Sequence, residues 1–359
     1  MKKLSLILFA IFLAANVLAS NKAINGIYYD FDKSSRQATV TYKGKSFDKY
    51  QNEYQGSIEI PSTVVYNGVI YQVSSISDGA FRGCKNLKNV TIPKSVNHIG
   101  MFAFKDTGID ANPHYWDNGV LYIGNCIVDA KYDQVPTYVE VRSDTRLIAD
   151  YAFAECEYMK SIHLPKNLLY IGKMAFALCT SLENIDIPAN VTQIEELSFW
   201  ACINLRRVQL PKSISGIASG AFGGCIRLDS ISLDSVNESY SIKDGVLFSK
   251  DMTTLVCYPA GLKQMTYTIP VSVRQIASYS FEAAINLEYV VLPQGLKIIR
   301  KGAFMGCESL TEVSVNKELS LIEEDAFSRC VQLMVLRIPK ATKLENKIGE
   351  PSLKIERIK

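Results

Sequence analysis

Histidine and tryptophan are scarce in this sequence, with three and two residues among 359. The three histidines, His98, His114 and His163, have no spacing typical of a metal site. Glycine-rich phosphate loops and the strained turn that exposes a catalytic serine are also missing. Lysine plus arginine (39) almost equals aspartate plus glutamate (36), so the basic excess of a nucleic-acid-binding protein is absent. These absences argue against an enzyme, a metal or cofactor site, and a nucleic-acid partner.

The first twenty residues have the layout of a secretory signal peptide. Lys2 and Lys3 precede an apolar run from Leu4 to Leu18, and Ala19 and Ser20 offer small residues for cleavage. This run is too short for a stable membrane span, and no later stretch is long enough for one. We therefore predict that residues 1–20 are removed on export and that the mature chain is secreted or displayed on the cell surface.

A phenylalanine recurs at intervals of 23 residues, and the period is interrupted by two longer gaps. An isoleucine precedes each of these phenylalanines by five residues, and alanine or serine precedes it directly. Further along each copy a β-branched or leucine pair follows, separated by one residue and usually ended by proline, as in Val90-Thr91-Ile92-Pro93. The nine marker residues are Phe81, Phe104, Phe153, Phe176, Phe199, Phe222, Phe281, Phe304 and Phe327.

The period predicts a solenoid, because a unit of 23 residues cannot bury its own apolar face and must stack on its neighbours. The alternating Val-x-Ile stretch predicts a short strand with two side chains inward and one outward. The Ala-Phe-x-x-Cys segment predicts a turn or a short helix on the opposite side. We therefore expect a β-rich solenoid of nine repeats over residues 73–340, with short parallel strands.

Seven of the nine cysteines lie three residues after a marker phenylalanine. A fixed place in each repeat favours a buried ladder of small apolar side chains over disulfides or metal ligands. Cys126 and Cys257 lie outside this ladder.

Both long gaps, near residues 108–137 and 234–266, contain a similar string. Asn118 to Tyr122 matches Asp244 to Phe248, and each string is followed by a second apolar stretch, which predicts a β-hairpin within an elaborated repeat. Residues 21–72 lack the repeat and are predicted to form an N-terminal β cap, with a tight hairpin at Tyr66-Asn67-Gly68-Val69. Residues 341–359 form a charged tail that we expect to be partly disordered.

The motif Ile-x-x-x-Ala-Phe-x-x-Cys-x-x-Leu-x-x-Val-x-Ile-Pro, seen from Ile76 to Pro93, resembles the BspA-like class of leucine-rich repeat proteins. The resemblance covers about three quarters of the chain. It implies a leucine-rich-repeat solenoid that is secreted or displayed on the cell surface. Some members are adhesins for host matrix proteins or act in contact between bacteria, and the family implies no catalytic residues for this chain.

A solenoid offers an extended, regular surface, so we predict protein binding, with adhesion to host or bacterial surface proteins and an extracellular partner such as a host matrix protein. An envelope structural protein and a glycan-binding accessory are the alternatives. A glycan reader would show a row of exposed aromatic residues, whereas only Tyr289 lies near the predicted strand face. The candidate contact residues, each of which has solvated surface as its competing interpretation, are Arg206, Arg207, Tyr289, Val291, His163 and Arg337.

Overall fold

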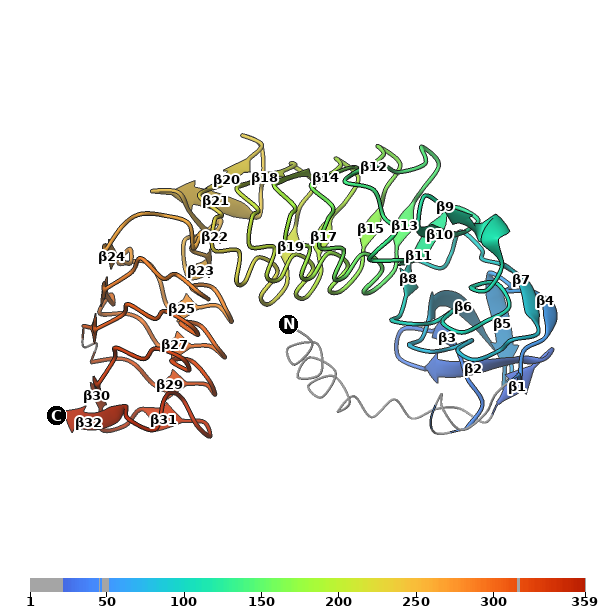
Figure 1. The fold of residues 1–359 in the computed structure, drawn as a ribbon. Coiled ribbons are helices and arrows are strands. Elements are labelled where there is room, and N and C mark those ends of the chain that lie inside the picture. Colours follow the sequence, from blue (N-terminus) through green and yellow to red (C-terminus); the bar gives the residue numbers. More distant parts are fainter. Residues whose placement is uncertain (1–21, 45, 47–51, 315–316, 359) are drawn as a thin grey trace. The chain divides into compact units, whose positions relative to one another are not determined.

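The computed structural model describes residues 22–44, 46, 52–314 and 317–358, so the predicted signal peptide, residues 1–20, lies outside the described residues. The described chain consists of short strands joined by turns (Figure 1). One short 3-10 helix, η2 (Pro113–Tyr115), is present, and no α-helix occurs among these residues. The chain divides into two compact units, Met1–Pro113 and His114–Lys359.

The first unit contains two sheets. The larger sheet pairs a mostly antiparallel cap with the first repeats, and it comprises β1 (Ala23–Ile24), β2 (Ile27–Asp32), β3 (Gln37–Thr41), β5 (Thr63–Tyr66), β6 (Val69–Ile76) and β8 (His98–Ile99). The smaller sheet pairs β4 (Gly56–Glu59) with β7 (Leu87–Thr91) in parallel. The tight hairpin predicted at Asn67-Gly68 is confirmed, since both residues have positive φ and β5 pairs antiparallel with β6.

The cap covers the first repeat by imitating one. Val40 of β3 pairs with Ile76, the first isoleucine of the repeat series, and Ile58 of β4 pairs with Val90. The ring of Tyr54 lies 4.7 Å from that of Phe81 and its hydroxyl donates to the carbonyl of Thr41 at 2.5 Å. The apolar face of the first repeat is therefore buried by a further turn, in which Ile58-Glu59-Ile60-Pro61 has the strand motif of the repeat. The prediction that residues 21–72 lack the repeat is wrong for this segment.

The second unit has two rows of strands, so each repeat contributes two strands and not one. The first row contains the predicted Val-x-Ile strands, which are β12 (Tyr138–Glu140), β14 (Ser161–His163), β16 (Asn184–Asp186), β18 (Arg207–Leu210), β20 (Ser230–Leu233), β24 (Thr266–Thr268), β26 (Tyr289–Val291), β28 (Glu312–Val313), β30 (Val335–Pro339) and β32 (Lys354–Ile358). The second row contains strands of two residues, and each of them except the last ends at an isoleucine that precedes a marker phenylalanine. They are β13 (Leu147–Ile148), β15 (Tyr170–Ile171), β17 (Gln193–Ile194), β19 (Gly216–Ile217), β25 (Gln275–Ile276), β27 (Ile298–Ile299), β29 (Leu321–Ile322) and β31 (Lys343–Leu344).

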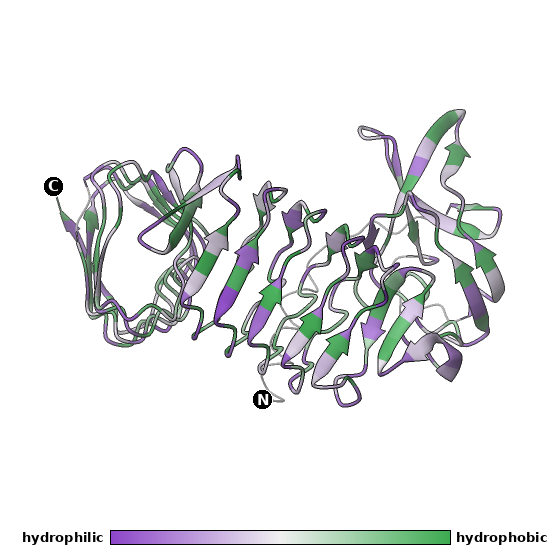
Figure 2. Ribbon diagram, turned by 90° about the horizontal axis from the view of Figure 1, so that it is seen from above, coloured by the Kyte–Doolittle hydropathy of each residue, from purple (hydrophilic) through white to green (hydrophobic). Residues whose placement is uncertain are grey.

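The marker phenylalanines form stacks inside the solenoid. All nine side chains are buried, and Phe176 lies with its ring centroid 5.3 Å from that of Phe153 and 5.3 Å from that of Phe199. The predicted leucine-rich-repeat solenoid is therefore confirmed. Hydropathy alternates along the strand arrows in Figure 2, as the Val-x-Ile pattern requires.

The segment around each phenylalanine is a turn and not a helix. Two positions of this turn, two residues before and two residues after the phenylalanine, have positive φ in all nine copies. Tyr151 (φ 65°) and Leu178 (φ 62°) occupy them in two copies, although glycine adopts this conformation at lower cost. Stacking on both sides evidently offsets the strain of the bulkier residues.

The cysteine ladder is confirmed as core packing, because all nine cysteines are free and buried. Five of the thiols donate to the carbonyl of the phenylalanine in the preceding repeat, as Cys202 does to Phe176 at 3.1 Å. Burial raises the pKa of Cys179, Cys202 and Cys225 well above the ordinary value, so these thiols remain protonated and unreactive.

Each insert is a three-stranded antiparallel meander whose last strand joins the second row. The first comprises β9 (Trp116–Asp117), β10 (Val120–Ile123) and β11 (Cys126–Ala130), and the second comprises β21 (Tyr240–Lys243), β22 (Val246–Ser249) and β23 (Thr254–Cys257). β11 pairs in parallel with β13, and β23 with β25. The predicted hairpins are present as the last two strands of each meander. The Asn118-Gly119 and Asp244-Gly245 pairs make the tight turn between its first two strands.

The charged tail is ordered and forms two strands, so the expectation of partial disorder is wrong. β31 pairs in parallel with β29, and β32 pairs in parallel with β30 along five residues. Ile355 packs against the core beside Leu336, so the tail adds one further turn to the stack.

Candidate functional site

The outward side of the first strand row forms two separate surfaces in the second unit. One, which we call the β12–β20 face, comprises β12, β14, β16, β18 and β20, and the other, the β24–β32 face, comprises β24, β26, β28, β30 and β32. The second insert comes between them in the chain. In most strands of both faces, one buried residue separates two outward residues, so the outward side chains form rows along the stack.

The structure divides the six predicted contact residues between these surfaces. His163, Arg206 and Arg207 lie on the β12–β20 face and are exposed. Tyr289, Val291 and Arg337 lie on the β24–β32 face. The six candidates therefore lie on two surfaces, and their contact with a partner stays a prediction.

The three residues on the β24–β32 face are less available to a partner than the other three. Tyr289 and Val291 are only half-exposed. The guanidinium of Arg337 is bound within the chain, because its Nε donates to Glu356 of β32 at 3.0 Å. This ion pair could not be anticipated from a tail that was expected to be disordered.

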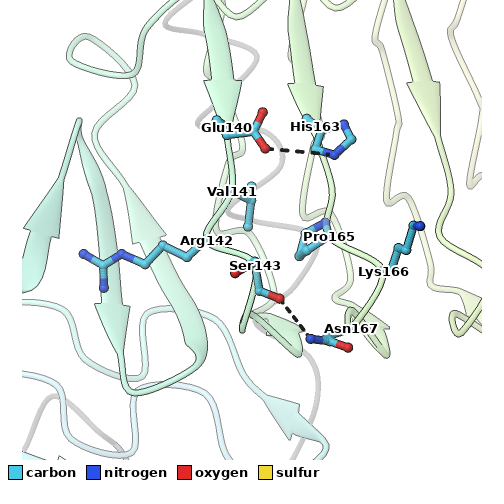
Figure 3. A pocket seen from close by; sticks show the side chains of 8 residues that line it. All are labelled: Glu140, Val141, Arg142, Ser143, His163, Pro165, Lys166 and Asn167. Atoms are coloured by element: carbon cyan, nitrogen blue, oxygen red, sulfur yellow. Dashed lines mark hydrogen bonds and ion pairs between the residues drawn. The ribbon is translucent and has the colours of Figure 1, made fainter.

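A groove with a volume of about 700 Å³ lies between two neighbouring repeats at one end of the β12–β20 face (Figure 3). Glu140 and His163 lie at one end, with 3.9 Å between the carboxylate oxygen and Nε2, and both side chains are largely exposed. At the other end Asn167 donates to the carbonyl of Ser143 at 3.0 Å. The groove is thus open, has polar side chains at both ends and is formed by the spacing of two repeats.

Arg142, whose backbone follows β12 at one side of this groove, contacts the first insert. Its side chain points away from the groove in Figure 3. The guanidinium lies 4.0 Å from the ring centroid of Tyr122 and its Nε 3.1 Å from Asp117, and both partners belong to the meander β9–β11. A cation–π contact combined with an ion pair fixes the meander against the strand that carries Glu140.

Tyr138 is an exposed aromatic residue on the strand face that sequence reasoning missed. Its side chain is 70% exposed, and it lies opposite Ser161 in the parallel pairing of β12 with β14. The signal was available in Tyr138-Val139-Glu140, where the repeat resumes after the first insert, but no marker phenylalanine identifies that turn. The statement that only Tyr289 lies near the strand face is therefore wrong.

A half-buried carboxyl, that of Glu282, lies elsewhere in the second unit, where the turn at Phe281 approaches the turn at Phe199. The indole N–H of Trp200 donates to both carboxyl oxygens of Glu282 at 3.1 Å. Gly223 makes room for this pair, because a Cβ at that position would lie 2.2 Å from the Glu282 carboxyl. Burial raises the pKa of Glu282 to about 7, and the Trp200 hydrogen bond and the charge of Arg329 oppose this shift.

The Glu282→Gln substitution is expected to flatten the pH dependence of stability near neutrality. The folded chain retains the Glu282 proton up to about pH 7, whereas the unfolded chain loses it near 4.5, so stability falls as pH rises between these values. We expect the wild type to lose on the order of 2 kcal/mol more than Glu282→Gln between about pH 5 and about pH 8 in urea titrations.

Trp200→Phe provides the matched control for this prediction. It removes the hydrogen bond that lowers the pKa of Glu282, so the decline of stability should extend to a higher pH than in the wild type. Identical pH profiles for the wild type and Glu282→Gln would contradict the assignment.

The described residues contain no group of three or more His, Cys, Asp or Glu side chains that could hold a metal ion. In the same part of the chain, no helix has the length and apolar character needed to cross a membrane.

Two rows of short parallel strands, a repeat of 23 residues and stacked phenylalanines define a leucine-rich repeat protein. The sequence profile of the BspA type leucine rich repeat region matches residues 49–126, 132–254 and 260–356 in six copies. The chain therefore belongs to the BspA-type leucine-rich repeat family, whose members are generally surface proteins for protein binding.

Several solved bacterial structures are similar to the chain. The pneumococcal vaccine antigen PcpA is 21% identical, with 94% of this chain and 82% of that chain covered and a TM-score of 0.47. A leucine-rich cell surface protein from Faecalibacterium prausnitzii is 20% identical, with 94% of each chain covered and a TM-score of 0.42. A leucine-rich repeat protein from Bacteroides ovatus is 22% identical, with 95% and 100% covered and a TM-score of 0.36. No curated protein matches the chain.

Proposed function

We propose that this protein is an exported adhesin that binds other proteins of host or bacterial surfaces through the β12–β20 face. The observation that carries the proposal is the set of outward side chains on five successive strands held by a stacked core. Exposed residues lie on β12, β14, β16 and β18, and the outward residues of β20 are half-exposed. Tyr138, Arg206 and Arg207 belong to the residue types that contribute most to protein interfaces. The rigid ladder keeps the ordering cost of binding low, because the backbone does not move to meet its partner.

A binding assay with the exported chain tests this function. Serum and matrix proteins, including fibronectin and fibrinogen, are immobilised, and the wild type is compared with a Tyr138→Ala/Arg207→Ala double variant. We expect the double variant to lose at least about tenfold in affinity, since two anchor side chains typically contribute 1–2 kcal/mol or more. Arg337→Ala on the β24–β32 face is the matched control and should bind like the wild type.

Glycan binding is the second candidate, and the exposed tyrosines favour it. Tyr138, Tyr158 and Tyr132 are 70%, 67% and 60% exposed, and aromatic rings of this kind offer flat surfaces to a sugar. A glycan array run beside the protein-binding assay separates the candidates. If the protein binds glycans, the wild type should bind the array and none of the immobilised proteins, and Tyr138→Ala should abolish the array signal. Surface labelling of whole cells tests the proposed export and display.

A further inference from the structure

Four charged residues of alternating sign form one row on the β12–β20 face. Each directly precedes a strand of this face, and together they form what we call the charge row: Lys160, Glu183, Arg206 and Asp229. The row is held in register by the backbone, since each amide after the first donates to the carbonyl of the preceding member at 2.9–3.2 Å. Successive members are therefore one strand spacing, about 4.8 Å, apart.

The four side chains of the charge row are exposed and available to a partner. Among the described residues none of them takes part in an ion pair of 4.0 Å or less, although opposite charges lie on neighbouring strands. The rest of the chain uses such neighbours differently, as where Arg300 pairs with Glu323 one repeat away. The four side chains of the charge row can therefore form ion pairs with charged groups of a partner.

The charges along the row read plus, minus, plus, minus. When the row is reversed, every charge therefore lies opposite a charge of the other sign. A two-fold axis parallel to the strands, passing between β16 and β18, would place Lys160 opposite Asp229 and Glu183 opposite Arg206 of a second copy. All four members would then face an opposite charge, and each pair would occur twice. A two-fold axis along the stack would instead bring Glu183 toward Asp186 of the same repeat in the second copy, so the first arrangement is favoured.

The two neighbouring rows accept the same arrangement. In the row that runs from Tyr138 of β12, Ser161 would face Ser230 and Asn184 would face Arg207. In the row that runs from Glu140 of β12, His163 would face Ser232 and Asp186 would face Gln209. No pair brings together two like charges, and all four pairs join groups able to form hydrogen bonds.

The repeat itself does not impose this pattern. The equivalent row on the β24–β32 face reads Met265, Glu288, Thr311 and Met334, which has one charge and two exposed methionines. These residues occupy the same backbone positions, with amide-to-carbonyl bonds of 2.8 and 2.9 Å between the first three. The alternating charges therefore occur on the β12–β20 face and not on the β24–β32 face.

We propose that the β12–β20 face binds the same face of a second copy of this chain, through the charge row and about a two-fold axis between β16 and β18. This inference rests on the proposed function, because the binding face is the same. The partner is a second copy of the chain. An adhesin of this kind would join two surfaces that both display it.

The contact would be weak in solution and sensitive to salt. Five short strands present a small area, and exposed ion pairs are screened within a Debye length of about 10 Å at 0.1 M salt. Many weak copies on two facing surfaces would nevertheless hold together, because each further contact forms at a high effective concentration. We expect sedimentation equilibrium at up to about 500 µM protein to show a dimer whose dissociation constant rises at least about tenfold between 50 mM and 500 mM salt.

Two charge reversals made separately and then mixed provide the decisive test. Glu183→Arg alone and Arg206→Glu alone each place like charges opposite one another, so each variant should sediment as a monomer. An equimolar mixture restores both pairs between unlike chains and should form a heterodimer at about the wild-type concentration. Glu288→Arg on the β24–β32 face is the matched control and should dimerise like the wild type.

This design separates self-association from the other roles of the charge row. Mixing cannot repair a contact within one chain, so recovery in the mixture excludes a purely structural effect of the reversals, and circular dichroism verifies that each variant is folded. A wild type that stays monomeric at 50 mM salt, or single variants that do not recover on mixing, would overturn the proposal. Binding of the same variants to immobilised matrix proteins is measured separately, so the proposed function can survive that result or fail independently of it.

Discussion

Replacing Phe176 with alanine is expected to lower the free energy of unfolding by about 3–5 kcal/mol, because it opens a cavity in a core that cannot collapse around it. The ring is fully buried and stacks on Phe153 and Phe199 with interplanar angles of 5° and 3°. The backbone on both sides is fixed by neighbouring repeats, so relaxation into the cavity is limited. Urea denaturation followed by circular dichroism measures the loss.

Two comparisons decide whether the stack is the cause. Phe222→Ala should have a smaller effect, because that ring is 5% exposed and stacks on Phe199 at the end of its series. Tyr158→Ala removes a ring of similar size that is 67% exposed and should change stability by no more than about 0.5 kcal/mol. A loss below about 1 kcal/mol for Phe176→Ala would show that the stacked rings are not the stabilising core.

The repeat and the inward positions could be predicted from the sequence because they depend on local periodicity. A 23-residue interval between phenylalanines requires equivalent turns to stack, and stacking buries those rings whatever the other residues are. The cysteine ladder followed from the same argument. The second row of strands was missed because two-residue strands ending at Ile171 or Ile299 are too short to show alternation.

Features that depend on contacts between distant segments could not be predicted. The left-handed turn positions carry Tyr151 and Leu178, which do not signal positive φ as glycine does. The division of the candidate residues between two surfaces follows from the second insert, whose length is visible in the sequence but whose path is not. The engagement of Arg337 by Glu356 required a tail that folds back onto β30.

The position of the second insert is expected to depend on the hydrogen bonds of one asparagine, Asn237. Asn237→Ala should therefore lower the free energy of unfolding by about 3–4 kcal/mol. This side chain is 2% exposed. Its Nδ2 donates to the carbonyls of Pro211, Lys212 and Ile214 at 3.0–3.4 Å, and its Oδ1 accepts from the amides of Ser239 and Tyr240 at 3.0 and 2.8 Å. Alanine would leave several of these backbone groups buried without a partner, at about 1–3 kcal/mol each.

Asn204→Ala is the matched control, because that half-buried side chain donates to a single carbonyl, of Thr180, at 2.7 Å, and its Oδ1 accepts from Arg227 at the exposed surface. It should cost about 1 kcal/mol. Since the bonds of Asn237 fix the start of β21, amide hydrogen exchange in Asn237→Ala should accelerate first in β21 and β22 and only later in β16 and β18. Equal losses for the two asparagines, or exchange that accelerates uniformly through the second unit, would show that the insert is anchored by its apolar strands and not by this hydrogen-bond network.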